Sequence, residues 1–498
     1  MTKNPRRLRR QLAALSTAAI LTLVSACGTS DSGSTATTDT VTSSGGTTSL
    51  TAGVVSVADT HADDDDGDYS TDGATTIDLA DGATTVDGDG AKVDGDVVTI
   101  TTAGTYLVSG TLSDGQVVVD STGDGKVVLV LDDADITSTT TSPVVVTAAD
   151  EAVVVLADGS TNSLSDAAAS AADDEDEDAP TATLFSMADL TIAGSGSLSV
   201  TGASNDAIAS KDGLVVLSGT IDVTAVDDGI RGKDYLVVEG GTLSVEAGGD
   251  GLKADNETAG ELGWVQLDAG SVTIAAGDDG VDAVGAINVS DGSLAVTGSE
   301  EGLEAATITV AGGTVDVTAD DDGLNATDGS AAGENAQDGV LVTISGGDVQ
   351  VTAGADGIDS NGSAIITGGT TTVSSAAGGG GDGSIDVNGT FAADGGTLVA
   401  LGGISTSPDT GSAQGFVAAS LDTAVEAGQT LAVVDADGTV VASYVVEQAA
   451  SAVIVSAEGI VTGDSYELRA GTDTDTDSLT TVGTATAGES TGGGTGGG

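Results

Sequence analysis

The chain has 498 residues, with 78 Asp and Glu against 12 Lys and Arg, so its formal charge is -66. A surface this negative repels nucleic acid and anionic membranes, which excludes both as direct partners. Only 2% of the residues are aromatic, so any core must be narrow and aliphatic.

The N-terminus has the features of an export signal. Five basic residues precede an apolar stretch from Leu12 to Val24, which is too short to span a bilayer as a stable anchor. The sequence Leu23-Val24-Ser25-Ala26-Cys27 resembles the bacterial lipobox, and Cys27 is the only cysteine. We therefore expect a signal peptide at 1–26, lipidation of Cys27, and a protein anchored by lipid on the extracellular face of the cell membrane. An ordinary signal peptide cut near Ala26 is the alternative.

Residues 27–74 are rich in Ser, Thr, Gly and Asp, which predicts a flexible tether. His61 stands alone in this stretch, so we do not expect it to act as a catalytic base. No Ser/His/Asp or Cys/His set can be assembled from the region that is predicted to fold.

Residues 75–400 are strand-rich, and their second half repeats one phrase. Asp228-Gly229-Ile230 and Asp250-Gly251-Leu252 are two copies, about 22 residues apart. Each copy precedes short runs that alternate apolar residues with Thr, Ser or Asp, the period-two pattern of strands with one buried face. Three such strands with Gly turns fit one coil of a solenoid. The sequence predicts an all-β fold, a right-handed parallel β-helix with three sides.

The remaining segments are assigned by composition. Residues 165–181 interrupt the strands as an acidic loop, and 401–470 predict a small C-terminal β-unit that caps the solenoid. Residues 471–498 predict a disordered tail.

Equivalent residues of successive coils lie about 4.8 Å apart, so the repeated phrase stacks carboxylates into a row. Two such charges repel by roughly 1 kcal/mol in water and about 3.5 kcal/mol at an effective dielectric constant near 20. Hard oxygen ligands favour Ca²⁺ between the coils, and screening by diffuse counterions is the alternative. The candidate metal ligands are Asp227, Asp228, Asp250, Asp278, Asp279, Asp282, Glu300, Glu301, Glu304, Asp321, Asp322, Asp356 and Asp359.

Three basic residues lie beside this row. Arg231 and Lys253 occupy equivalent positions in adjacent coils, should point outward, and have Lys233 close by. They could grip the carboxylates of an acidic sugar, Arg bidentately and Lys as a point charge. Alternatively, they neutralise neighbouring Asp residues.

Two aromatic residues fall on one line when the coils are aligned on Gly241 and Gly270. Tyr235 is then level with Trp264 one coil later. The pair could form a platform for sugar stacking, or a hydrophobic ladder beneath the insertion at 255–262.

Several motifs resemble a family of bacterial carbohydrate-binding β-helix proteins. The residues that carry the resemblance are Gly104-Thr105-Tyr106, Leu184-Phe185-Ser186, Ile208-Ala209-Ser210-Lys211-Asp212, Asp227-Asp228-Gly229-Ile230-Arg231-Gly232-Lys233-Asp234 and Gly249-Asp250-Gly251-Leu252-Lys253-Ala254-Asp255. The resemblance implies a fold similar to calcium-dependent pectate lyases, Ca²⁺ in the acidic coils, and binding of polygalacturonate. The sequence departs from the family pattern at Ala207 and Glu301, which argues against metal binding at those two coils.

Three functions remain open from the sequence. The first is a non-catalytic, surface-tethered protein that binds acidic plant cell-wall polysaccharide, with Arg231, Lys233, Lys253, Tyr235 and Trp264 as the contact residues. The second is a polysaccharide lyase in which Lys253 or Arg231 removes the proton beside a uronate carboxylate. The third is a structural or adhesive solenoid without a sugar ligand.

Overall fold

The computed structural model describes residues 60–63, 65–167, 179–257, 262–330, 335–376, 383–403, 406–473 and 478–489. The expected signal peptide, Cys27 and most of the acidic loop lie outside these residues. Within the described ranges, no helix has the length and apolar character needed to cross a membrane.

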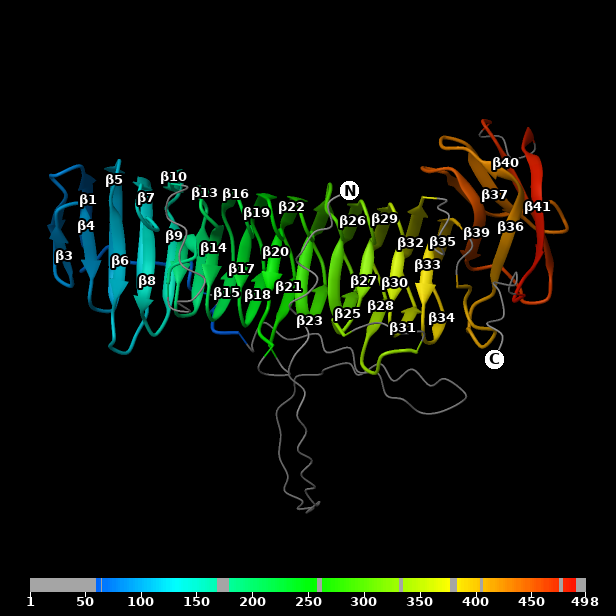
Figure 1. Ribbon diagram of the computed structural model, residues 1–498, viewed down its shortest axis with the longest axis horizontal. Helices are drawn as coiled ribbons and strands as arrows, with labels where there is room; N and C mark the ends of the chain where they lie inside the picture. The colour runs from blue at the N-terminus through cyan, green and yellow to red at the C-terminus, as the bar shows by residue number, and fades with distance from the viewer. Residues whose placement is uncertain are drawn as a thin grey trace, which may run out of the picture. The chain divides into compact units, whose positions relative to one another are not determined.

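The right-handed parallel β-helix is confirmed, and its coils follow the repeat that the sequence predicts. One coil consists of β14 (Asp206–Ser210), β15 (Gly213–Val216) and β16 (Thr220–Ala225). The next coil, 22 residues later, places β17 (Ile230–Gly232) on β14, and the register pairs Ile208 with Ile230. Figure 1 shows these strands following one another in sequence order along the stack.

The strands form three columns of parallel neighbours, one for each side of the solenoid. The first column holds β4 (Val97–Ile100), β6 (Gln116–Asp120), β8 (Val144–Ala148), β11 (Ala182–Ser186), β14, β17, β20 (Leu252–Ala254), the first halves of β23 (Val281–Val289) and β25 (Leu303–Val310), β27 (Leu324–Ala326), β30 (Ile358–Ser360) and β33 (Ile385–Val387).

The second column holds β5 (Gly104–Leu112), β7 (Val127–Ser138), β9 (Ala152–Leu156), β12 (Leu190–Gly194), β15, β18 (Tyr235–Val238), β21 (Trp264–Leu267), the second halves of β23 and β25, β28 (Leu341–Ile344), β31 (Ser363–Ile366) and β34 (Phe391–Ala393). The third holds β10 (Thr161–Asp166), β13 (Ser197–Gly202), β16, β19 (Thr242–Ala247), β22 (Ser271–Ala276), β24 (Ser293–Val296), β26 (Thr314–Ala319), β29 (Asp348–Ala353), β32 (Thr370–Ser375) and β35 (Thr397–Gly402). At the N-terminal end, β1 (Thr75–Ala80) pairs with β5, and β2 (Thr85–Asp87) and β3 (Ala91–Asp94) add antiparallel pairs.

One aliphatic core runs through the coils from Ile77 to Ile454, because alternate residues of every strand point inward. The corners need glycine where the backbone turns most sharply. Gly241 has φ 88°, and a Cβ there would come within 2.7 Å of the Gly219 carbonyl oxygen of the coil below.

The C-terminal β-unit is larger than the sequence predicts. β36 (Phe416–Val425) and β39 (Ala450–Ser456) pair antiparallel, and β39 also pairs with β35 at the end of the coils. β37 (Thr430–Val434), β38 (Val440–Val445), β40 (Ser465–Gly471) and β41 (Thr480–Thr486) form a separate sheet. The expected disordered tail is therefore wrong for 480–486, because β41 buries Val482 and satisfies the edge of β40.

The expected tether is ordered in its last part. We call residues 60–68 the strap; residue 64 is not among those described. The strap lies against the second column, where the His61 N–H donates to the Tyr235 hydroxyl at 3.0 Å and the Lys126 ammonium pairs with Asp63 at 3.0 Å. The polar composition did not predict this order, because pairs of side chains hold the strap in place. Its residues take no part in the sheet ladders, so they have no strand pattern.

Candidate functional site

The acidic residue of the repeated phrase stands just before each first-column strand, and hydrogen bonds connect successive copies. The N–H of Asp228 donates to Asp206 Oδ1 at 3.2 Å, that of Asp250 to Asp228 Oδ1 at 3.0 Å, and that of Asp279 to Asp250 Oδ1 at 2.9 Å. The pattern resumes where the N–H of Asp356 donates to Asp322 Oδ1 at 2.8 Å. One oxygen of each such carboxylate is thus used by the fold, and the other remains available to a cation.

Basic side chains neutralise the first coils of this row. The Lys253 ammonium lies 3.6 Å from Asp228 Oδ2 and 3.3 Å from Asp282 Oδ2, and it also contacts Asp250. The Arg231 guanidinium binds Asp255 bidentately at 3.1 and 2.6 Å and lies 3.9 Å from Asp206. The sequence left open whether these cations grip a sugar or balance charge, and this geometry favours charge balance.

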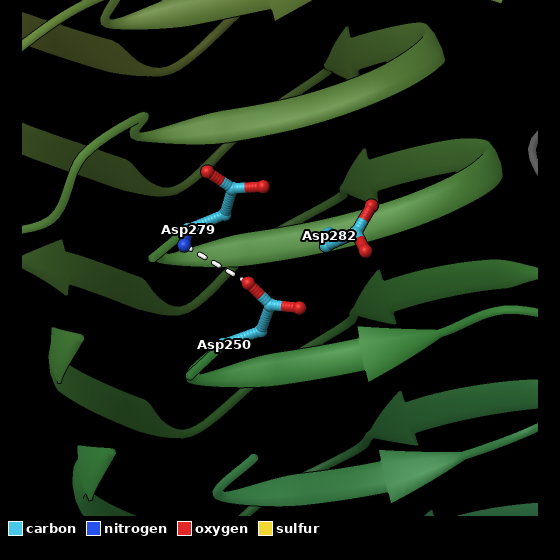
Figure 2. Close-up of side chains that lie close together, drawn as sticks. All are labelled: Asp250, Asp279 and Asp282. Atoms are coloured by element: carbon cyan, nitrogen blue, oxygen red, sulfur yellow. Dashed lines mark hydrogen bonds between the residues drawn. The ribbon is translucent and has the colours of Figure 1, made fainter. Parts of the chain in front are cut away.

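Figure 2 shows how Asp250, Asp279 and Asp282 converge from two coils. One carboxylate oxygen from each lies within 4.8 Å of the others, a spacing at which a metal ion could be bound. The Lys253 ammonium, however, already contacts Asp250 and Asp282. The side chain of Lys253 therefore already supplies a cation to this cluster.

The next cluster shares Asp279 with the first and extends into the following coil. Asp279, Glu301 and Glu304 each offer a carboxylate oxygen within 4.8 Å of the others. Two ligands of one Ca²⁺ at about 2.4 Å can lie at most about 4.8 Å apart, so the spacing fits. Among the described residues, no Lys or Arg forms an ion pair with Asp279 or Glu301. The sequence argued against metal at Glu301, whereas the structure gives Glu301 a place in a candidate cluster.

Asn325 completes this cluster from the following coil, in the position equivalent to Glu304. Its Nδ2 donates to Glu301 at 2.7 Å, while its buried Oδ1 has no hydrogen-bond partner. An unpartnered buried oxygen is costly, and an amide oxygen is an ordinary ligand of Ca²⁺. Asn325 bonds to Glu301 through its nitrogen, and the three carboxylates of the cluster are the donor set that suits a hard divalent cation.

Electrostatics distinguish the two parts of the row. Burial, together with the carboxylates of Asp250, Glu301 and Glu304, raises the pKa of Asp279 to about 9. In contrast, burial alone lowers the pKa of Lys253, but the carboxylates around the ammonium outweigh burial and raise that pKa above its ordinary value. Lys253 therefore stays protonated and cannot act as a base.

A third group of predicted ligands lies further along the row. Burial is the main cause that raises the pKa of Asp322 to about 8 and that of Asp359 to about 7, and nearby carboxylates including Asp356 add to both shifts. Asp356 Oδ1 accepts the N–H of Gly383 at 2.6 Å.

The outer neighbours of the row, the predicted ligands Asp227, Asp278, Glu300 and Asp321, lie apart from both clusters. Glu300 and Asp321 line an open hollow together with Asp320 and the buried Ser299. None of the four is in a described group whose carboxylates approach within 4.8 Å.

Lys233 is joined by a basic residue that the sequence interpretation did not select. Lys211 occupies the same corner one coil earlier, and its ammonium lies 6.0 Å from the centre of the Phe185 ring. Burial and the positive charges of Arg231 and Lys233 lower the pKa of Lys211. Within the described ranges neither lysine forms an ion pair, although the carboxylates of Asp206 and Asp255 act on the Lys211 ammonium from further away. The signal was available: Lys211 precedes Lys233 by one repeat of 22 residues.

The alignment of Tyr235 with Trp264 is correct. Their rings stack with centroids 4.9 Å apart and planes at 15°. Trp264 is only 5% exposed and packs in an outward-facing cluster with Val215, Val237 and Ala62 of the strap. The rings form a covered ladder in this structure, and the strap, rather than the insertion alone, supplies the described cover.

Fold and site together define an all-β solenoid with carboxylate clusters at one corner that could hold a metal ion. The chain matches the family model described as "Carbohydrate-binding domain-containing protein" over residues 94–334 and 286–493. The chain therefore belongs to the family of carbohydrate-binding domain-containing proteins.

A curated protein of this description from Acetivibrio thermocellus is 31% identical over 137 residues, which are 28% of this chain and 48% of that protein. The match thus spans about half the length of the relative. A solved structure described as the polysaccharide lyase-like protein from C. thermocellum, gadolinium derivative, has 31% sequence identity and a TM-score of 0.43. That match covers 51% of this chain and 98% of the other.

Proposed function

We propose that this protein binds acidic plant cell-wall polysaccharide of the polygalacturonate or pectin type in a calcium-dependent and non-catalytic manner. We further propose that it acts outside the cell, tethered to the membrane through a lipid on Cys27. The observation that carries the calcium part is the cluster of Asp279, Glu301 and Glu304, whose carboxylate oxygens lie within 4.8 Å of one another, a spacing that one Ca²⁺ can bridge.

In this proposal the protein supplies two kinds of contact to an anionic chain. Ca²⁺ held by Asp279, Glu301 and Glu304 would bridge a sugar carboxylate, because the ion takes six to eight oxygen ligands and the cluster offers fewer. Lys233, with Lys211, would bind further carboxylates as point charges. Membership of a carbohydrate-binding family supports a polysaccharide as the partner.

The lyase alternative is disfavoured by the surroundings of its candidate bases. A general base must release its proton near the working pH. The carboxylates around Lys253 and the Asp255 carboxylate beside Arg231 both raise the pKa of the basic group. A structural or adhesive solenoid remains the second alternative.

Retardation in an affinity gel containing polygalacturonate tests the proposal. We expect retardation of the purified protein in Ca²⁺ and its loss in chelator. Glu301→Gln/Glu304→Gln should lose the calcium dependence, while Asp222→Asn/Glu246→Gln, which removes two exposed carboxylates from the third column, should keep it. Unchanged retardation in chelator would exclude bridging by Ca²⁺, and absorbance of unsaturated products at alkaline pH would favour the lyase.

A further inference from the structure

The strap and the face beneath it are not used by the proposed calcium site. The strap crosses the second column from Tyr235 on β18 back to Lys126 at the start of β7. These contacts span strands β7, β9, β12, β15 and β18, four steps of about 4.8 Å. The strap is not fully extended, because the Asp66 N–H donates to the Asp63 carbonyl in a turn, and the side chains of His61 and Asp66 make the contacts at the two ends.

Polar groups connect the two ends beneath the strap. The Tyr235 hydroxyl accepts the His61 N–H and lies 2.8 Å from its Nδ1, and His61 Nε2 lies 3.0 Å from Thr191 Oγ1. Burial is the main cause that lowers the pKa of His61 to about 4, so the ring is neutral. The neutral ring donates at one nitrogen and accepts at the other, and Nδ1 also lies 3.3 Å from Asp189 Oδ1.

The other end is an ion pair of the kind that an acidic polymer would make. The Lys126 ammonium lies 2.9 Å from Glu151 and contacts two strap carboxylates, Asp63 at 3.0 Å and the buried Asp66. Ala62 packs in the cluster that covers Trp264. An acidic segment with a turn at Asp63–Asp66 therefore places carboxylates on a lysine, and its Ala62 packs over an aromatic pair.

The backbone of the strap is held only weakly to the coils. At residues 61–63 and 65–68, the backbone N–H groups of Asp63, Asp66 and Asp68 donate within the strap, to Asp66 Oδ2 and to the Asp63 and Asp65 carbonyls, and the His61 N–H donates to the Tyr235 hydroxyl. The strap can therefore leave without breaking any sheet ladder, and the core beneath stays closed because it lies on the inner side of the strands.

We propose that the strap is a built-in competitor: it occupies a second polysaccharide-binding face, formed by Lys126 and the Tyr235–Trp264 pair, and an acidic polysaccharide displaces it. This inference rests on the proposed function, since it assigns the same class of ligand to a further surface. In the displaced state Lys126 would bind a sugar carboxylate, and the sugar would contact the edges of the stacked rings, whose faces lie against each other and against the neighbouring coils at Gly213 and Ala286.

The test compares strap variants in the polygalacturonate gel with Ca²⁺ present. His61→Ala/Asp63→Asn/Asp66→Asn removes the contacts at both ends, and Asp65→Asn/Asp68→Asn removes the same two charges from exposed strap positions outside these contacts. If the parent exposes the face about a tenth of the time, the released variant should bind about tenfold more tightly. The control should bind like the parent, which separates release from the change in charge.

A peptide of the parent sequence 58–70, added in excess, should return the released variant to the parent affinity. Equal binding of parent, released variant and control would overturn the competitor role while leaving the proposed function intact. Tightening by the control as much as by the released variant would also overturn it, because net charge would then suffice. Failure of every variant, including the parent, to bind any acidic polysaccharide would overturn the proposed function itself.

Discussion

The two parts of the acidic row solve the same electrostatic problem in different ways. Around Asp228 and Asp250, Lys253 inserts an ammonium between the coils, and Arg231 holds the neighbouring Asp255. Around Asp279 and Glu301, which converge with Glu304, no described Lys or Arg forms an ion pair with either residue. The fold tolerates stacked carboxylates where a lysine or arginine side chain neutralises them. Elsewhere the carboxylates need bound protons or metal ions.

The test with the largest expected effect removes the Lys253 ammonium. Lys253→Met should lower the free energy of unfolding in chelator by about 3 kcal/mol, because breaking a largely buried ion pair leaves its partners uncompensated. Chemical denaturation measures the loss. Lys233→Met, which removes a lysine without an ion pair among the described residues, should stay within about 0.5 kcal/mol of the parent.

Calcium should restore part of the stability of Lys253→Met, since Asp250, Asp279 and Asp282 would then form a cluster without a cation. If Lys253→Met lost no more free energy of unfolding than the Lys233→Met control, the Lys253 ammonium would not stabilise the row.

The second test acts on the other part of the row and should have the opposite sign. Glu301→Gln/Glu304→Gln should raise the free energy of unfolding in chelator, because it removes mutual repulsion of carboxylates. Calcium at a hundredfold excess over its Kd should stabilise the parent by about 2.7 kcal/mol and this variant much less. Thermal unfolding with and without Ca²⁺ provides the measurement. If Ca²⁺ did not change the melting temperature of the parent, the metal would not contribute to the stability of this part of the row.

The smallest effect is the pH dependence. The pKa values of Asp279, Asp322 and Asp359 are raised to about 9, 8 and 7, from 3.8, so the native state retains protons that the unfolded state has lost. In chelator, stability should therefore fall as pH rises from about 5 to about 9, by at most about 1.4 kcal/mol per pH unit for each retained proton.

Saturating Ca²⁺ should flatten this dependence, because the metal binds the deprotonated ligands and competes with protons. Denaturation midpoints at pH 5, 7 and 9, with and without Ca²⁺, test the sign. If stability in chelator increased with pH, the native state would not retain protons on these carboxylates as inferred.

The sequence by itself determined the solenoid and its register. The return of an acidic-Gly-aliphatic phrase, about 22 residues apart wherever no insertion intervenes, fixes which residues stack, since a parallel coil places each residue above its equivalent in the coil before. The stacking of Tyr235 on Trp264 followed from the same alignment. The acidic row and its basic neighbours were likewise visible in the repeat.

Only the tertiary structure decided which of these groups have partners. Arg231 and Lys253 are equivalent in the repeat to the Asp282 and Glu304 of later coils, and the repeat does not reveal that Lys253 reaches carboxylates of three coils at once. Pairing depends on the reach and direction of side chains, which a one-dimensional period does not contain. The strap was missed for the same reason: its polar residues bind positions that lie 60 or more residues away in the chain.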